Sequence, residues 1–176
     1  MQTRDLVHIA LLIALCAALG YLMAFVPNVE LISAAVFASG SLQGVRRGAV
    51  IGAGAELIYA GFNPYGVSPP PLYAAQVIGM SAVGAGGGGL RRALAACPWP
   101  LQAALAGGSG FVLTLLYDVL TNTAIWLGAR ESSNWMAVVA MGLCFPFPLA
   151  HVIANTVSFA VVTPAVRSAL LRRSPA

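Results

Sequence analysis

The side chains that could bind or react are few, and the most distinctive ones lie in pairs within long apolar stretches. Asp118 and Asn122 are four residues apart, as are His151 and Asn155, so each pair shares one face of a helix. An ionisable group in an apolar segment costs about 3 kcal/mol or more against lipid, so it normally faces the interior of a bundle. Carboxylate, imidazole and amide groups bind polar molecules by hydrogen bonds and charge pairing. The pattern therefore predicts a polar cavity between helices.

The composition indicates that these residues belong to a membrane-embedded chain. Hydrophobic residues make up 59% of the 176 positions, charged residues only 8%, and the mean hydropathy is +0.85. A soluble domain is usually about 25% charged, so this chain cannot cover a water-facing surface and lipid must be its solvent. The nine basic residues are all arginine and lie in short segments between apolar stretches. Nucleic acid is therefore not an expected partner.

Hydropathy and helix-breaking residues predict an all-α integral membrane bundle that forms a single transmembrane domain over 1–176. At about 20 residues per span, six transmembrane helices fit this length. They are predicted at about 6–26, 29–44, 48–62, 72–90, 101–127 and 148–171, with a short interfacial helix at about 135–143. The prolines within 63–71 predict an ordered loop, because they remove backbone donors and fix φ. The glycine run at 86–89 is interpreted as a helix terminus that permits a tight turn.

The arginines give the bundle an orientation. With six spans, eight of the nine arginines fall on one face of the membrane, and only Arg130 falls on the other. Arginine is enriched in cytoplasmic loops. Both the N-terminus and the C-terminus are therefore predicted to be cytoplasmic.

This orientation places most of the unusual polar side chains within about two helical turns of the external face. The candidate substrate-binding residues are Asn28, Glu30, Glu56, Asn63, Tyr65, Ser68, Tyr73, Gln76, Asp118, Asn122, His151 and Asn155. Singly, some have an ordinary alternative: Asn155 or Gln76 could bond a neighbouring helix, and Tyr73 could belong to the aromatic belt at the interface. Together they predict a cavity that opens to the outside.

Two catalytic interpretations fail on predicted geometry. Ser109 and His151 could form the Ser–His dyad of an intramembrane protease, but they are predicted near opposite faces of a hydrocarbon core about 30 Å thick. A nucleophile and its base need contact at about 3 Å. Glu56 and Asp118 have no flanking pattern that supports an aspartyl dyad. No enzyme activity, metal site or intrinsic cofactor is expected.

Several segments resemble one transporter family in combination. They are 26–31 (VPNVEL), 63–66 (NPYG) with 68–71 (SPPP), 75–80 (AQVIGM), 116–122 (LYDVLTN) and 151–156 (HVIANT). These segments are similar to the S-component, the substrate-binding subunit, of an energy-coupling factor (ECF) transporter. The likeness extends over about residues 4 to 170.

The resemblance implies a vitamin-capture subunit in the inner membrane of a prokaryotic cell. Its implied partners are a small vitamin-like substrate, a transmembrane coupling subunit and two cytoplasmic ATPases, which would use ATP. Small residues at four-residue spacing form the docking surface of the family, and Ala10, Ala14 and Ala18 match that spacing. Ordinary internal packing of an alanine-rich helix is the alternative for these three.

The resemblance leaves the substrate open. A bulky cobalamin-like ligand is the interpretation that general likeness to the broad, poorly assigned branch of the family favours. The functional alternatives are a stand-alone secondary carrier or channel for a small solute and an intramembrane hydrolase.

Overall fold

The computed structural model describes residues 3–26, 29–129, 134–144 and 146–171, and in these ranges every regular element is a helix. The helices are α1 (Thr3–Met23), α2 (Ile32–Gln43), α3 (Val45–Gly61), α4 (Pro70–Gly89), α5 (Arg91–Ala96), α6 (Trp99–Ala129), α7 (Trp135–Cys144) and α8 (Pro146–Leu171). The prediction of an all-α chain is confirmed for this part of the protein.

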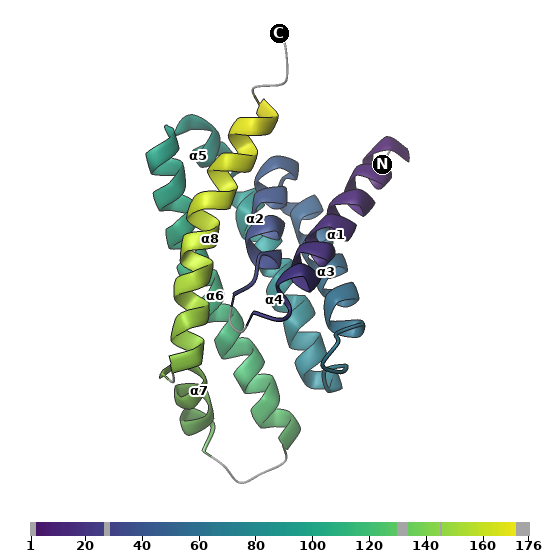
Figure 1. Cartoon of the computed structure of the whole chain (residues 1–176), viewed down its shortest axis with the longest axis vertical. Coiled ribbons are helices and arrows are strands. Elements are labelled where there is room, and N and C mark those ends of the chain that lie inside the picture. Colours follow the sequence, from purple (N-terminus) through teal and green to yellow (C-terminus); the bar gives the residue numbers. More distant parts are fainter. Residues whose placement is uncertain (1–2, 27–28, 130–133, 145, 172–176) are drawn as a thin grey trace.

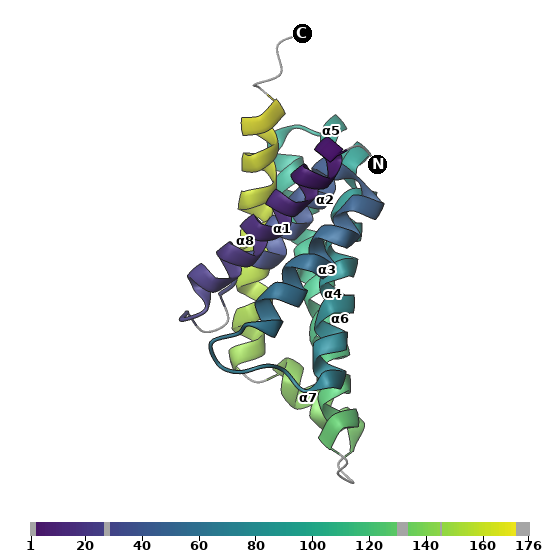
Figure 2. The same ribbon diagram turned by 90° about the vertical axis from the view of Figure 1, so that its right-hand side faces the viewer.

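The longer helices run up and down a single bundle. The beginning of α1, the end of α8 and the short α5 lie at one end of it, and α7 lies at the opposite end (Figures 1 and 2). An ion pair of 3.0 Å joins Asp5 in α1 to Arg47 at the start of α3, so the α2–α3 turn belongs to the first of these ends. We call this end, with α5 and the start of α1, the terminal end, and the other the α7 end.

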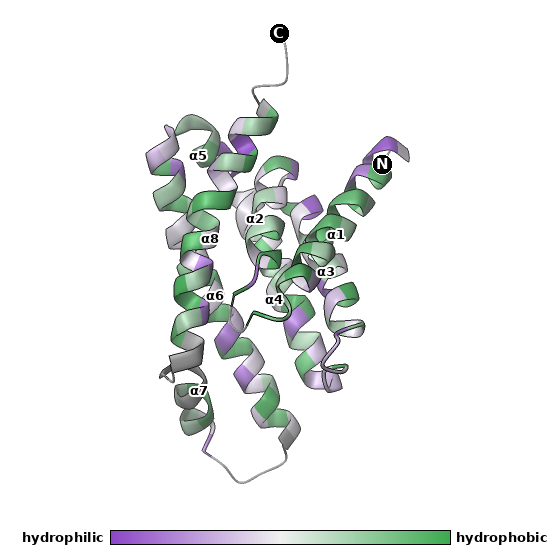
Figure 3. Cartoon of the chain, in the orientation of Figure 1, coloured by the Kyte–Doolittle hydropathy of each residue, from purple (hydrophilic) through white to green (hydrophobic). Residues whose placement is uncertain are grey.

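Hydrophobic residues recur along every long helix (Figure 3), and many large ones are exposed. By length and composition, three helical segments are able to cross a membrane: Thr3–Met23, Trp99–Gly128 and Leu149–Leu170. Only 22–28% of their most apolar windows is buried inside the bundle, so large apolar side chains face outward. These features indicate a membrane protein, because such a surface is stable against lipid and not against water.

All predicted helix boundaries lie within three residues of the observed ones, and two of the differences have physical causes. The α8 helix begins at Pro146 and not at Pro148, since proline in a first turn gives up no helical hydrogen bond. The α4 helix likewise begins at Pro70, with proline in its first positions. The sequence analysis did not predict α5, a helix of six residues that carries Arg91 and Arg92.

The core is built around α2, in which every residue from 32 to 41 is buried. Its partners α3 and α4 approach it closely through glycine. A Cβ atom on Gly84 would lie 2.0 Å from the carbonyl oxygen of Gly48, and one on Gly40 would lie 2.0 Å from that of Gly84. Backbones in contact in this way hold the short helix α2 rigidly among its neighbours.

The glycine run at 86–89 ends α4, as predicted, and also has a second role. These residues lie inside the last turn of α4, and a Cβ on Gly87 would lie 2.1 Å from the carbonyl oxygen of Phe37 in α2. The glycines therefore serve close helix packing as well as helix termination. Phe37 also packs on Phe159 of α8, with ring centroids 5.0 Å apart, and this contact closes the core on the α8 side.

Candidate functional site

A polar network joins the beginning of α2 to α6 and α8. Glu30 lies in the connection just before α2, Asp118 is in α6, and His151 and Asn155 occupy successive turns of α8. The sequence analysis predicted all four, and the structure brings them together. Because α8 begins at the α7 end, and because α2 begins part of the way along the bundle, the network lies in the half of the molecule away from the terminal end (Figure 1).

Four polar contacts hold the network together. The Nδ1 atom of His151 lies 3.1 Å from Oδ1 of Asp118, and its Nε2 atom lies 3.4 Å from Oε1 of Glu30. The side-chain amide of Asn155 donates to Oε1 of Glu30 at 3.2 Å, and its Nδ2 lies 3.0 Å from Nε2 of His151. The imidazole is therefore held between two carboxylates from different parts of the chain.

The protonation of His151 decides which of these contacts is a hydrogen bond. A proton on Nδ1 is donated to Asp118 in either state. When Nε2 carries no proton, it accepts from Asn155. A second proton on Nε2 replaces that bond with a charged contact to Glu30.

Glu30 is held by three neighbours. The hydroxyl of Ser33, in the first turn of α2, donates to the same Oε1 atom that accepts from Asn155. Burial raises the pKa of the Glu30 carboxyl, but hydrogen bonds from His151, Ser33 and Asn155 and the charge of His151 outweigh burial, so this pKa lies below its ordinary value. Glu30 is an anion at neutral pH.

Glu56 forms a second acidic position beside the network. This side chain of α3 is 2% exposed and is hydrogen bonded to the hydroxyl of Tyr117 in α6. Its carboxyl lies near enough to that of Glu30 for the two to repel each other when both are ionised. The buried end of α3 therefore adds a further acid to the same half of the bundle.

A cavity of about 240 Å³ opens beside these groups. Its polar lining comes from Glu30, His151 and Tyr59, and the remaining lining residues are Gly20, Met23, Ala24, Val26 and Val29. The end of α1 thus forms the apolar wall of the cavity, and the network forms the polar wall. Sites for small ligands commonly combine an apolar lining with a few convergent polar groups in this way.

The loop between α3 and α4 reaches the same region. The side chain of Asn63 accepts a hydrogen bond from the backbone of Tyr65 at 2.9 Å and is also bonded to Tyr59, which lines the cavity. The hydroxyl of Tyr65 donates to the carbonyl of Ala24, another lining residue, at 3.2 Å. Gly66, with φ of 105°, makes the turn that this arrangement needs.

Other predicted site residues take different positions. Asn122 donates to the backbone carbonyl of Asp118 within α6, and Tyr73 donates to the carbonyl of Leu57, so both side chains serve helix contacts. Ser68 is half-buried in the α3–α4 loop. Asn28 lies outside the described residues.

Gln76 is a more informative case. Its Oε1 atom is buried and without a hydrogen-bond partner. One turn further along α4, Met80 lies 3.8 Å from the hydroxyl of Ser33, and a Cβ on Gly79 would meet the ring of Tyr117. Gln76 therefore lies on the face of α4 that is directed toward α2 and α6.

Three residues of this region escaped the sequence analysis: Ser33, Tyr59 and Tyr117. Ser33 follows Glu30 at a spacing of three, and side chains three residues apart can meet across a helical turn, which was the signal that could have found it. Tyr117 precedes Asp118 and so points to a different side of α6. Only the neighbouring α3 explains why that side is also polar.

The predicted docking residues lie on the outside of the bundle. Ala10, Ala14 and Ala18 are all exposed along one face of α1, while Ile9 and Cys16 belong to its buried face. These alanines do not pack inside the chain, so internal packing is not their role in this structure.

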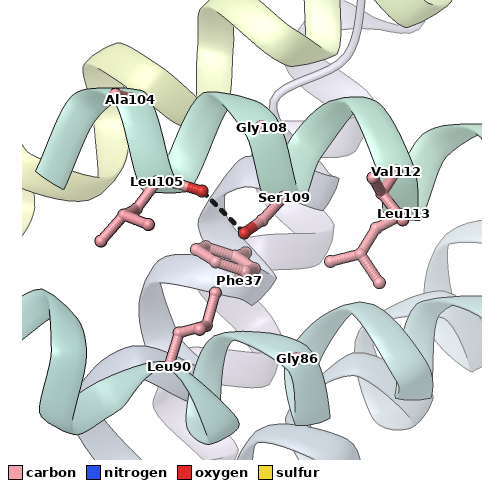
Figure 4. Close-up of a pocket in the computed structure, with 9 residues that line it drawn as sticks. All are labelled: Phe37, Gly86, Leu90, Ala104, Leu105, Gly108, Ser109, Val112 and Leu113. Atoms are coloured by element: carbon pink, nitrogen blue, oxygen red, sulfur yellow. Dashed lines mark hydrogen bonds between the residues drawn. The ribbon is translucent and has the colours of Figure 1, made fainter. Parts of the chain in front are cut away.

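Ser109 has no place in the polar network. It lines an apolar groove of about 460 Å³ between α4 and α6, and its hydroxyl donates to the carbonyl of Leu105 at 2.7 Å. Figure 4 shows Leu105, Leu113, Leu90 and the ring of Phe37 around it. His151 lines the cavity of about 240 Å³ instead, so these two residues do not share a site.

No group of three or more His, Cys, Asp or Glu side chains in the described ranges is placed to hold a metal ion. No protein-family model matches the chain, and no similar protein was found among curated proteins or among solved structures. The function must therefore be argued from the geometry of the polar network and its cavity.

Proposed function

We propose that this protein is a substrate-capture subunit of an ECF-type importer that binds a small vitamin-like molecule from the outer face of a prokaryotic cell membrane. The observation that carries the proposal is the network of Glu30, Asp118, His151 and Asn155 beside a cavity of about 240 Å³. Ionisable groups are costly inside a membrane and are retained where they bind or conduct something.

In the proposed topology the chain crosses the membrane six times and both termini are cytoplasmic. This topology determines on which side of the membrane the network lies. The helices α1, α2, α3, α4, α6 and α8 would be the spans. Arginines at 4, 46, 47, 91, 92 and 167 belong to elements at the terminal end of the bundle. The positive-inside rule makes that end cytoplasmic, so the cavity would open toward the outside.

In this proposal the energy for uptake comes from partner subunits. The exposed face of α1 with Ala10, Ala14 and Ala18 supports docking of a transmembrane coupling subunit, because small residues allow close approach of a second helix. Two cytoplasmic ATPases would bind that subunit.

The size of the cavity bears on the substrate. At about 240 Å³ it lies below the roughly 300–1,000 Å³ that is usual for drug-sized ligands. A compact molecule fits it better than the bulky cobalamin-like ligand that the sequence analysis favoured.

Orientation is tested by cysteine labelling from each side of the membrane. In a chain without its natural cysteines, Ser68→Cys should react with an impermeant maleimide added outside intact cells, and Ser168→Cys should react only after the membrane is opened. The reverse pattern, or both residues reacting from the same side, would contradict the proposed topology.

Function is tested by solute uptake in cells that express the chain with and without a coupling module. Asp118→Asn should reduce uptake of the captured solute, while Asp5→Asn, at the terminal end, is the matched control and should not. Gradient-driven uptake by the purified chain alone in liposomes would instead support a secondary carrier.

A further inference from the structure

We infer that the captured molecule is a cation with N–H donor groups, such as a compact amine, amidine or protonated heterocycle. This inference rests on the proposed capture function and specifies its substrate class. Two independent observations carry it: the balance of charge around the cavity, and the chemical type of the buried polar atoms that have no partner.

The charge balance is negative. Glu30 lines the cavity, and Asp118 stands behind His151. His151 is the one cationic side chain in contact with these groups within the described part of the chain. The described arginines belong to the terminal end, where Arg167 is bound to the carbonyl of Ser41 at 2.8 Å.

Even a fully protonated His151 leaves the network with an excess of acid. Glu30 and Asp118 both contact the imidazole, at 3.4 and 3.1 Å, so one positive charge faces two carboxylates. Uncompensated negative charge in a low-dielectric bundle is unfavourable, and a positively charged ligand relieves it. An anionic ligand would increase the same penalty.

The unpartnered atoms give the second observation. In this half of the described structure the buried side-chain atoms without a hydrogen-bond partner are Oδ2 of Asp118, Oδ1 of Asn155 and Oε1 of Gln76. All three are acceptors. Asp118 is 7% exposed and Asn155 is 1% exposed, so bulk water does not satisfy them. A buried acceptor without a donor costs free energy and calls for an explanation.

A ligand with several N–H groups answers both observations at once. Its positive charge would lie against Glu30 in the cavity, and its donors would turn toward Oδ2 of Asp118 and Oδ1 of Asn155, whose side chains contact the lining residues His151 and Glu30. A ligand built mainly of acceptors, such as a carboxylate or phosphate, would leave all three oxygens unsatisfied. The surplus of acceptors therefore selects a donor-rich cation.

The probes for the test are benzamidine, benzamide and benzoate, which share a planar ring and differ in charge from positive through neutral to negative. The thermal unfolding midpoint of the purified full chain in lipid nanodiscs is measured against the concentration of each. Benzamidine should raise the midpoint most, benzamide less, and benzoate not at all. Equal responses to the three, no response to benzamidine, or a larger response to benzoate would overturn the inference.

Variants localise the effect. Asp118→Asn and Glu30→Gln should each raise the benzamidine concentration that gives half of the full midpoint shift. The increase should be about tenfold or more, as expected for loss of a hydrogen bond to a charged group. Asp5→Asn removes a carboxylate at the terminal end and should leave the response unchanged. A benzamidine response that survives both network variants would place the cation elsewhere and refute the assignment.

The failure of this inference can be told from the failure of the capture function. A neutral or anionic solute that is taken up in an Asp118-dependent manner would preserve capture and remove the cationic class. Benzamidine binding that depends on Glu30 and Asp118, without any solute uptake, would preserve the cation site and remove the importer role.

Discussion

The side-chain amide of Asn155 donates a hydrogen bond to Glu30 at 3.2 Å, although 125 residues separate the two in the chain. This contact joins α8, one of the last elements of the fold, to the connection that precedes α2. Both residues also touch His151. The bond therefore ties the start of α2 to α8 at the wall of the cavity, and several properties of the protein should depend on it.

Removal of this link should destabilise the protein. Asn155→Ala takes away the donor to Glu30 and the partner of His151, and a network left partly unsatisfied typically loses about 1–3 kcal/mol. The thermal unfolding midpoint in nanodiscs measures the loss. Asn122→Ala is the matched control, because that amide bonds only a backbone carbonyl of its own helix. Equal midpoints for the two variants would show that the link carries no stability.

The contribution of Glu30 should depend on pH in a defined direction. Because the pKa of Glu30 is lowered in the folded chain, its stabilising effect is complete above the ordinary value of 4.5 and is lost as the pH falls through the lower folded value. The difference in unfolding midpoint between the natural chain and Glu30→Gln should therefore be steady from about pH 7 to 5 and shrink below that range. A difference that grows on acidification would contradict the arrangement.

The fold was predictable to the extent that local signals set it. Apolar runs and proline positions predicted helices that overlap α1, α2, α3, α4, α6, α7 and α8. The six-residue α5 was missed because it is too short to show a periodic apolar face. The role of Gly84 and Gly87 was missed because close backbone approach depends on the partner helix and leaves no local signal.

The sequence predicted most residues of the polar network but not which of them contact one another. Polar residues such as Asp118 in α6 and His151 in α8 were recognisable because the residues around them are apolar. Which of them meet is decided by helix rotation, and rotation separated Asn122 and Tyr73 from the network. Tyr117 joined the region only because Glu56 of α3 lies opposite it.

Close packing at glycine should tolerate no added methyl group. Gly84→Ala would put a Cβ 2.0 Å from the carbonyl oxygen of Gly48, so the helices must separate, at a cost of about 1–3 kcal/mol or more. Gly108→Ala in α6 is the control, since a Cβ there meets nothing within 4 Å and alanine favours helix. The two unfolding midpoints should move apart, with Gly84→Ala lower. A Gly84→Ala midpoint equal to that of Gly108→Ala would refute the close contact.

The outer face of α1 should be needed for assembly and not for ligand binding. Ala14→Arg places a long cation on that face and should abolish co-purification with a coupling subunit while cavity binding persists. Leu116→Arg is the control, because Leu116 is an exposed residue of α6 and tests the cost of an arginine against lipid. Assembly that survives Ala14→Arg, or that fails equally in both variants, would remove the docking role of the alanines.

The central claim is that the network of Glu30, Asp118, His151 and Asn155 holds a small molecule. Native mass spectrometry of the freshly purified chain, compared with Asp118→Asn prepared in the same way, tests this most directly. The account predicts a bound small molecule on the natural chain that is lost or greatly reduced in the variant and retained in Asp5→Asn. An identical bound fraction in all three proteins, or no bound molecule on the natural chain even after incubation with cell extract, would contradict it.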